Sequence, residues 1–371
     1  MKNHPGTGRI KKSDVPLRQL VQLLFLAATL AVGIQFYLFS AQAAGGGNIS
    51  IARPPGVEAF LPLSALIGLK YFLSTGVFSR IHPSSLVLFL TICTTAFFFK
   101  RGFCSWICPI GLFSDLLSSL HNRLVKKKFR LPGWLDKAFQ GIKYSLAGFF
   151  IWAILVRMPG DAAGRFIQSP FNRFADVKML EFFTRISPSA LIAILVLIIL
   201  SLVLPRFWCR YLCPYGALLG VLGLFSLGKI KRNDAGCTHC RKCEAACPAA
   251  IPISRKTGIR SLECSACLRC VDACPQKKAL NFSVLTGLSM TPKRLGLALL
   301  LLFAAGIIPA KLSGYWQNSI PISDYRMYFS SDQKPEQAME KIIKNKEMDD
   351  NKRQRMKQMI QRMETPHTVP N

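Results

Sequence analysis

The sequence predicts a multi-pass α-helical membrane protein with a small α+β domain in one of its loops. Half of the 371 residues are hydrophobic, and they gather in uncharged runs instead of recurring periodically. The chain is also strongly basic, with 48 Lys and Arg against 19 Asp and Glu. Most of its 13 cysteines fall in one hydrophilic loop. A disordered basic chain would not be half hydrophobic, and soluble enzymes rarely combine such charge with such hydrophobicity.

Five hydrophobic segments come close to the length that about 30 Å of hydrocarbon requires. We predict these membrane-spanning helices: Leu20–Phe39, Ser84–Phe99, Tyr144–Val156 with its neighbours, Ser189–Leu204 and Leu295–Ala310. The segment Pro55–Gly76 is interrupted by a proline and a lysine, so we predict that it is re-entrant or interfacial. Ala41-Gln42-Ala43 follows the first run as in a signal peptide, but the run is long and we expect an uncleaved anchor.

The basic residues predict the orientation. With five spans, residues 1–19, 100–143 and 206–294 lie on one side and hold 29 of the 48 Lys and Arg residues. The positive-inside rule makes this side the cytoplasm. The predicted organisation is a basic head (1–19), a membrane domain (20–228), a cysteine-rich cytoplasmic domain (229–290), a last transmembrane helix (291–312) and an extracytoplasmic charged tail (313–371). The charge then records orientation and contact with membrane lipid, as at Lys126–Lys128, and does not indicate nucleic acid.

Two cysteine runs share the spacing C-x2-C-x2-C-x3-C, and each is followed by proline. This spacing is typical of bacterial ferredoxins with two [4Fe–4S] clusters, in which the fourth cysteine of each run ligates the other cluster. Zinc sites seldom show two such runs, and disulfides are rare in a reducing compartment. We therefore predict two ligand sets: Cys237, Cys240, Cys243 and Cys274 for cluster 1, and Cys264, Cys267, Cys270 and Cys247 for cluster 2.

Four further cysteines form a second pattern, C-x3-C-P. The strings FCSWICPIG and WCRYLCPYG contain Cys104, Cys108, Cys209 and Cys213, and each follows a predicted span that ends on the cytoplasmic side. The membrane domain therefore resembles an internal duplication. If the copies pack together, the thiolates could ligate a third cluster or a tetrahedral metal. A pair of redox dithiols and a purely structural turn are the alternatives. Trp106 is expected in the interfacial aromatic belt or in a quinone pocket.

Other cofactor chemistry finds no support in the sequence. None of the five histidines lies in mid-span, and no C-x2-C-H motif occurs, so no haem is predicted. Neither G-x-G-x-x-G nor a Walker motif indicates a nucleotide site. What remains is electron transfer, by a carrier or a component of a quinol dehydrogenase and not by a stand-alone enzyme.

These motifs resemble those of membrane-bound polyferredoxins of the NapH/NosR/YccM type. The resemblance also includes RPPGVEAFLPLSALIGLKYFLSTG and covers about residues 20–330. It implies a protein of the bacterial inner membrane that passes electrons between quinol and a respiratory reductase partner. The alternative is an accessory, maturation or redox-sensing protein for a respiratory metalloenzyme. The short head before the first span leads us to expect no flavin domain. The tail from Lys334 to Glu364 has strong helix propensity. We expect either a helix that docks on an extracytoplasmic partner or a solvated helix or disordered tail.

Overall fold

A computed structural model describes residues 15–124, 131–276, 279–285 and 287–330. Most of the basic head, Lys126–Lys128 and the predicted tail helix Lys334–Glu364 lie outside these residues. The described helices are α1 (Val15–Ala44), α2 (Pro62–Thr75), α3 (Pro83–Phe99), α4 (Gly102–Trp106), α5 (Pro109–Leu124), α6 (Gly133–Ile151), α7 (Gly160–Gln168), α8 (Pro170–Arg173), α9 (Ala175–Thr184), α10 (Pro188–Val203), α11 (Pro214–Leu222), α12 (Lys242–Ala246), α13 (Arg269–Asp272), α14 (Pro292–Leu312) and α15 (Ile322–Ser330).

One small antiparallel sheet accompanies the helices, in the order β1-β2-β3. Its strands are β1 (Gly228–Arg232), β2 (Leu280–Val284) and β3 (Leu288–Ser289). Short helical turns of other types occupy Pro55–Phe60, Trp152–Arg157, Trp208–Leu212, Gly223–Phe225 and Ile253–Arg255. Proline begins many of the helices, where its missing N–H costs no hydrogen bond. The side chain of Thr291 caps α14 by accepting a hydrogen bond from the backbone N–H of Arg294.

Every predicted span is helical over most of its length. Within the described residues, α1, α6 with its continuation to Arg157, and α14 are long and apolar enough to cross a membrane. The pair α9 and α10, bent by 77°, could be a fourth span, whereas α3 has only 17 residues. The protein is thus a membrane protein with three or four candidate spans, and the count of five stays a prediction. α2 has 14 residues, or about 21 Å of helix, too short to cross the bilayer alone.

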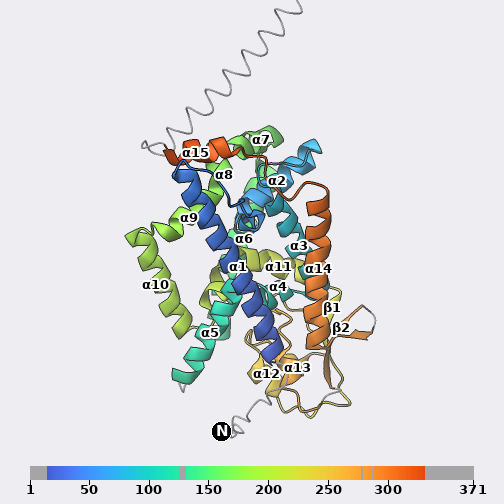
Figure 1. Ribbon diagram of the computed structural model, residues 1–371. Coiled ribbons are helices and arrows are strands. Elements are labelled where there is room, and N and C mark those ends of the chain that lie inside the picture. Colours follow the sequence, from blue (N-terminus) through green and yellow to red (C-terminus); the bar gives the residue numbers. More distant parts are fainter. Residues whose placement is uncertain (1–14, 125–130, 277–278, 286, 331–371) are drawn as a thin grey trace, which may run out of the picture.

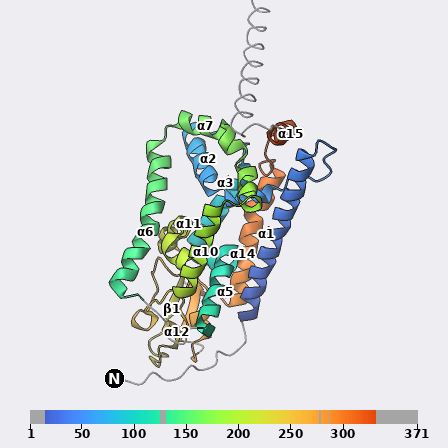
Figure 2. The same cartoon turned by 90° about the vertical axis from the view of Figure 1, so that its left-hand side faces the viewer.

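The elements gather at two ends of the molecule. The strands, α12, α13 and the beginning of α1 lie at one end, and α2, α7 and α15 lie at the other (Figure 1). We call these the ferredoxin end and the far end. Figure 2 shows α6 running along one side of the molecule up to α7 at the far end. The start of α1 and the cysteine-rich region therefore lie at the same end, as the charge distribution predicts. Which end faces the cytoplasm stays a prediction.

The ferredoxin end is continuous with the helical bundle. One hydrophobic cluster contains Leu88 of α3, Trp106 of α4 and Leu219 of α11, together with Ile230 and Phe282 of the sheet. All five side chains are buried. The cysteine-rich region therefore lies directly on the membrane helices and shares their core.

The far end holds a buried network of charged side chains. The guanidinium of Arg53 lies 2.9 Å from Glu58 and 2.6 Å from Asp176. The imidazole Nδ1 of His82 lies 3.2 Å from Glu58, and the hydroxyl of Tyr325 donates a hydrogen bond to Asp176. Two carboxylates thus compensate the two basic side chains and join the segment before α2 to α3, α9 and α15.

Candidate functional site

The two cysteine runs of the ferredoxin end fold alike. In the first run, His239 and Arg241 have positive φ angles of 51° and 56°. Ala266 and Leu268 occupy the equivalent positions of the second run, with φ angles of 47° and 58°. Left-handed backbone is uncommon outside glycine, so its repetition at matched positions indicates the same loop structure around both groups of thiols.

Each predicted ligand set lines a cavity of its own. One cavity, here called the outer cavity, is lined by Cys237, Cys240, Cys243 and Cys274. A second one, the inner cavity, is lined by Cys247, Cys264, Cys267 and Cys270. The structure therefore brings together the cysteines that the spacing groups, including the exchange of the fourth cysteine between runs. The assignment of these cysteines as cluster ligands stays a prediction.

The surroundings of the two cavities differ. Buried isoleucines line the inner cavity, among them Ile230, Ile251 and Ile253. Polar residues such as His239 and Arg241 line the outer cavity, and Cys240 is exposed there. Burial and hydrogen bonding set the potential of an iron–sulfur cluster, so the two cavities offer different electrostatic environments.

The C-P-x-G ends of the membrane motifs have a steric explanation. The prolines begin α5 and α11 directly after the second cysteine of each motif. A Cβ at Gly111 would lie 2.0 Å from the carbonyl oxygen of Cys104. In the other copy, the backbone N–H of Gly216 donates to the sulfur of Cys213 at 3.3 Å. In the first copy, only glycine lets the following helix approach the cysteine turn this closely.

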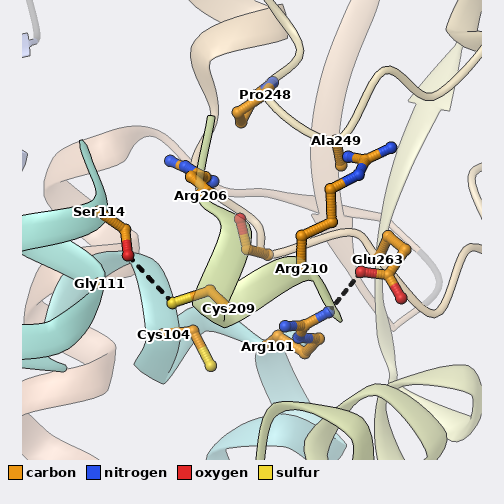
Figure 3. A pocket seen from close by; sticks show the side chains of 11 residues that line it. Arg101, Cys104, Gly111, Ser114, Arg206, Cys209, Arg210, Pro248, Ala249 and Glu263 are labelled. Carbon is orange, nitrogen blue, oxygen red and sulfur yellow. Dashed lines mark hydrogen bonds and ion pairs between the residues drawn. The ribbon is translucent and has the colours of Figure 1, made fainter. Parts of the chain in front are cut away.

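The two membrane motifs meet at a third cavity (Figure 3). Cys104 and Cys209 both line it, and the hydroxyl of Ser114 lies 3.2 Å from the sulfur of Cys209. Cys108 and Cys213 are not among its lining residues. The structure therefore packs the two copies together and places their first cysteines on one cavity.

Two arginines of this third cavity escaped the sequence analysis. Arg101 and Arg206 both line it, and each lies three residues before the first cysteine of its motif. Arg101 pairs with Glu263 at 3.0 Å and Arg206 with Asp115. The Nε atoms of both arginines are buried and have no hydrogen-bond partner among the described residues. Their identical offset from the cysteines was the available signal. Buried guanidinium Nε–H groups that lack an acceptor beside thiols fit an anionic ligand such as a thiolate-bound cluster.

Glu263, next to Cys264, connects the inner cavity to the membrane helices. Its carboxylate accepts hydrogen bonds from Arg101 at 3.0 Å, Lys143 at 2.8 Å and Tyr144 at 2.7 Å. Burial alone would raise the pKa of Glu263, but the two cationic side chains lower it below its usual value. A single carboxylate thus holds the loop of the inner cavity against α4 and α6.

The middle residues of the two membrane motifs bind different parts of the protein. In the first motif, Ser105 donates to the carbonyl of Ser265 at 2.6 Å, and the indole of Trp106 donates to that of Ala266 at 3.1 Å. Both carbonyls lie between Cys264 and Cys267 in the sequence. The expectation that Trp106 belongs to an interfacial belt is wrong, because its side chain is fully buried against the ferredoxin loop.

In the second motif, Arg210 and Tyr211 replace Ser105 and Trp106. Both donate to the carboxylate of Asp136 in α6, Arg210 through two nitrogens at 2.9 and 2.7 Å and Tyr211 at 2.6 Å. The duplicated motifs have therefore diverged, since the first contacts the inner cavity and the second is fixed to a membrane helix.

The described residues contain no group of three or more His, Cys, Asp or Glu side chains that could hold a single metal ion. Their cysteines are instead grouped in fours around the inner and outer cavities. A cubane cluster, whose four irons each bind one thiolate, suits such a wider arrangement.

Comparison with known proteins agrees with these features. The family described as "4Fe-4S binding domain" matches residues 81–132 and 186–233, which contain the two membrane motifs. A second family, "4Fe-4S dicluster domain", matches residues 229–280. No solved structure matches the chain.

Several curated proteins are similar in sequence. YccM of Escherichia coli is 38% identical over 340 residues, 87% of this chain and 94% of that protein. Protein NirI of Paracoccus denitrificans is 32% identical over 259 residues, 67% of this chain and 34% of its own length. The ferredoxin-type protein NapH of Haemophilus influenzae is 28% identical over 211 residues, 54% of this chain and 69% of its length.

Proposed function

Because this chain belongs to the family of membrane-bound polyferredoxins that includes YccM, NapH and NosR, we propose that it passes electrons between the quinol pool and a respiratory reductase partner. The family makes it an iron–sulfur electron-transfer protein of a membrane. The identity of the donor and of the acceptor is our proposal. We further propose that the ferredoxin end faces the cytoplasm, as its basic charge favours.

Two [4Fe–4S] clusters are proposed for the ferredoxin end. The outer cavity would hold cluster 1 through Cys237, Cys240, Cys243 and Cys274. The inner cavity would hold cluster 2 through Cys247, Cys264, Cys267 and Cys270. Bound there, such clusters supply reversible one-electron storage. The chain contributes the thiolates, the apolar lining of the inner cavity and the hydrogen bonds that fix its loop.

The contact between the first membrane motif and the inner cavity is the observation that carries this proposal. Ser105 and Trp106 lie between two motif cysteines and bind the carbonyls of the loop that supplies Cys264 and Cys267. An electron carrier that serves the membrane needs its redox centre close to the bilayer surface. A ferredoxin domain attached for another reason would not require its cysteine loop to rest on the membrane motif.

We also propose that Cys104, Cys108, Cys209 and Cys213 ligate a third cluster. The match of both motifs to a 4Fe-4S binding domain supports a cluster over a dithiol pair. The unpartnered Nε atoms of Arg101 and Arg206 support an anionic group at the same place. Their positive charge would offset the negative charge that four thiolates bring into a buried site.

Counting iron and acid-labile sulfide per purified chain tests the number of clusters. We expect about twelve irons in the wild type and about eight in Cys104→Ala, because each cubane holds four. Tyr211→Phe, which keeps all thiols, is the control and should retain the wild-type count. About eight irons in all three proteins would refute the third cluster and leave the two ferredoxin clusters standing.

Reduction by quinol tests the proposed donor. Protein in lipid nanodiscs should show an iron–sulfur electron paramagnetic resonance signal after addition of a reduced short-chain quinol, and the same signal with dithionite. A signal with dithionite alone would rule out quinol as donor. A strain that lacks this protein distinguishes electron supply from the alternative role in maturation of a respiratory metalloenzyme. A terminal reductase that lacks its metal in this strain would indicate maturation. A complete terminal reductase that no longer receives electrons from quinol would indicate electron supply.

A further inference from the structure

We propose that the surface around the outer cavity is the docking site for an acidic one-electron carrier protein. This surface consists of His239, Cys240, Arg241 and Lys242, and we call it the outer face. The inference rests on the proposed electron-transfer function and adds the chemical nature of the partner. It follows from comparing the two matched halves of the ferredoxin end.

The inner half shows what a covered cysteine loop looks like in this fold. Leu268, the equivalent of Arg241, is 1% exposed in the hydrophobic core. Arg269, the equivalent of Lys242, forms an ion pair at 3.1 Å with Asp115 of α5. The membrane motif also donates two hydrogen bonds to the carbonyls of the same loop. The inner loop is therefore covered by hydrogen-bond donors and by a carboxylate that meets its cationic side chain.

The outer half presents the same loop without such a cover. Cys240, Arg241 and Lys242 are all exposed. Within the described part of the chain, neither basic side chain has a hydrogen-bonding or ionic partner. Both halves share the left-handed positions that shape the loop, so the difference lies in what covers them. A partner protein that brings a carboxylate to Lys242 would reproduce the contact that Asp115 makes with Arg269.

Electrostatics indicate that the partner is acidic. Two further basic residues, Arg255 and Lys256, are exposed. Ser254, next to Arg255, lines the outer cavity itself. The acidic residues of the region are already engaged, because Asp234 pairs with Arg232, Glu244 accepts hydrogen bonds from Ser254, and Asp272 has a partner as well. The outer face therefore carries an excess of positive charge beside the exposed thiol, which favours encounter with a negative surface.

The exposed cysteine favours a soluble carrier protein as partner. α12, which contains Lys242, lies at the ferredoxin end, near the beginning of α1 (Figure 1). Exchange of one electron with a soluble carrier requires an exposed redox site, and Cys240 is the exposed cysteine of the outer cavity. Contact with anionic lipid does not require such a site.

Binding of flavodoxin, a small acidic one-electron carrier, to the full chain in nanodiscs of neutral lipid tests the proposal. We expect Arg241→Glu/Lys242→Glu to weaken the affinity by about tenfold or more, because like charges would then face each other. This difference should vanish at about 0.5 M salt, where surface charges are screened. The matched control Arg165→Glu/Lys311→Glu reverses two exposed charges at the far end and should bind as the wild type does.

The iron content of each variant separates this proposal from the proposed function. If the charge-reversed protein keeps its iron and binds flavodoxin with wild-type affinity, the docking site is wrong while the electron-transfer function stands. If the charge-reversed protein loses iron, the flavodoxin affinity of the milder variant Arg241→Gln/Lys242→Gln is measured instead. We expect this variant to keep its iron and to bind flavodoxin more weakly than the wild type, with a smaller loss of affinity than the charge reversal causes. If basic cytochrome c binds as tightly as flavodoxin, the proposal is overturned. It is also overturned if phosphatidylglycerol vesicles bind through Arg241 and Lys242 while flavodoxin does not bind.

Discussion

Replacing Glu263 by glutamine would remove the charge that holds the inner loop to the membrane helices. The carboxylate receives three donors, from Arg101, Lys143 and Tyr144. Its side chain is 13% exposed, while that of Lys143 is fully buried. Breaking a buried ion pair costs about 3–5 kcal/mol, and we expect about 3 kcal/mol because glutamine keeps one acceptor oxygen and the site retains some contact with water. The substitution would leave two buried cations without a counter-charge.

Limited proteolysis of the protein in detergent measures this change. Cleavage through a transiently open state follows its equilibrium population, so about 3 kcal/mol corresponds to cleavage between α11 and α14 that is roughly a hundredfold faster. Asp161→Asn is the matched control, because it removes the charge of an ion pair whose side chains are 66% and 74% exposed, and we expect no measurable change. Cleavage of both variants at the wild-type rate would refute the bridging role of Glu263.

Two further predictions concern glycine and histidine positions. Gly111→Ala should lower thermal stability and iron content, because the new Cβ would clash with the carbonyl oxygen of Cys104. The control Gly141→Ala should leave both unchanged, because a Cβ there would have nothing within 4 Å. Iron counts and thermal unfolding measure the two effects, and equal behaviour of the two variants would contradict the steric argument. Burial opposes charge on both His82 and Glu58, but their pairing raises the pKa of His82 above 6.5 and lowers that of Glu58 below 4.5. The contribution of His82 to folding stability is then complete below pH 6.5 and is lost as pH rises through its raised pKa. The contribution of Glu58 to folding stability is complete above pH 4.5 and is lost as pH falls through its lowered pKa. The unfolding temperature should therefore be highest and nearly constant between pH 4.5 and pH 6.5. If the unfolding temperature of His82→Gln falls with rising pH as steeply as that of the wild type, the role of His82 is contradicted.

The sequence predicted the elements that depend on local spacing. The hydrophobic runs became helices, and the cysteine spacing alone grouped the thiols that line the inner and outer cavities. The repeated C-x3-C-P motif predicted an internal duplication, and the fold brings the two copies together at Cys104 and Cys209. These signals succeed because a turn that wraps a cluster, or a helix that spans lipid, is specified within a few consecutive residues.

Contacts between distant segments could not be predicted in this way. Trp106 reads as an interfacial aromatic residue in the sequence, but its indole finds an acceptor in Ala266, 160 positions away. In the sequence, Arg101 is one of many basic residues near a helix end, and only the fold places it beside Glu263 in the lining of a thiol cavity.

By itself, the sequence determined that this is a basic membrane protein with two ferredoxin-type cysteine runs and a duplicated membrane thiol motif. Only the tertiary structure decided that the first copy rests on the inner cavity and the second on α6, and that Arg241 and Lys242 stay exposed. The reason is physical. Spacing specifies which thiols can share a cluster, whereas burial and the pairing of charges depend on which segments the fold brings together.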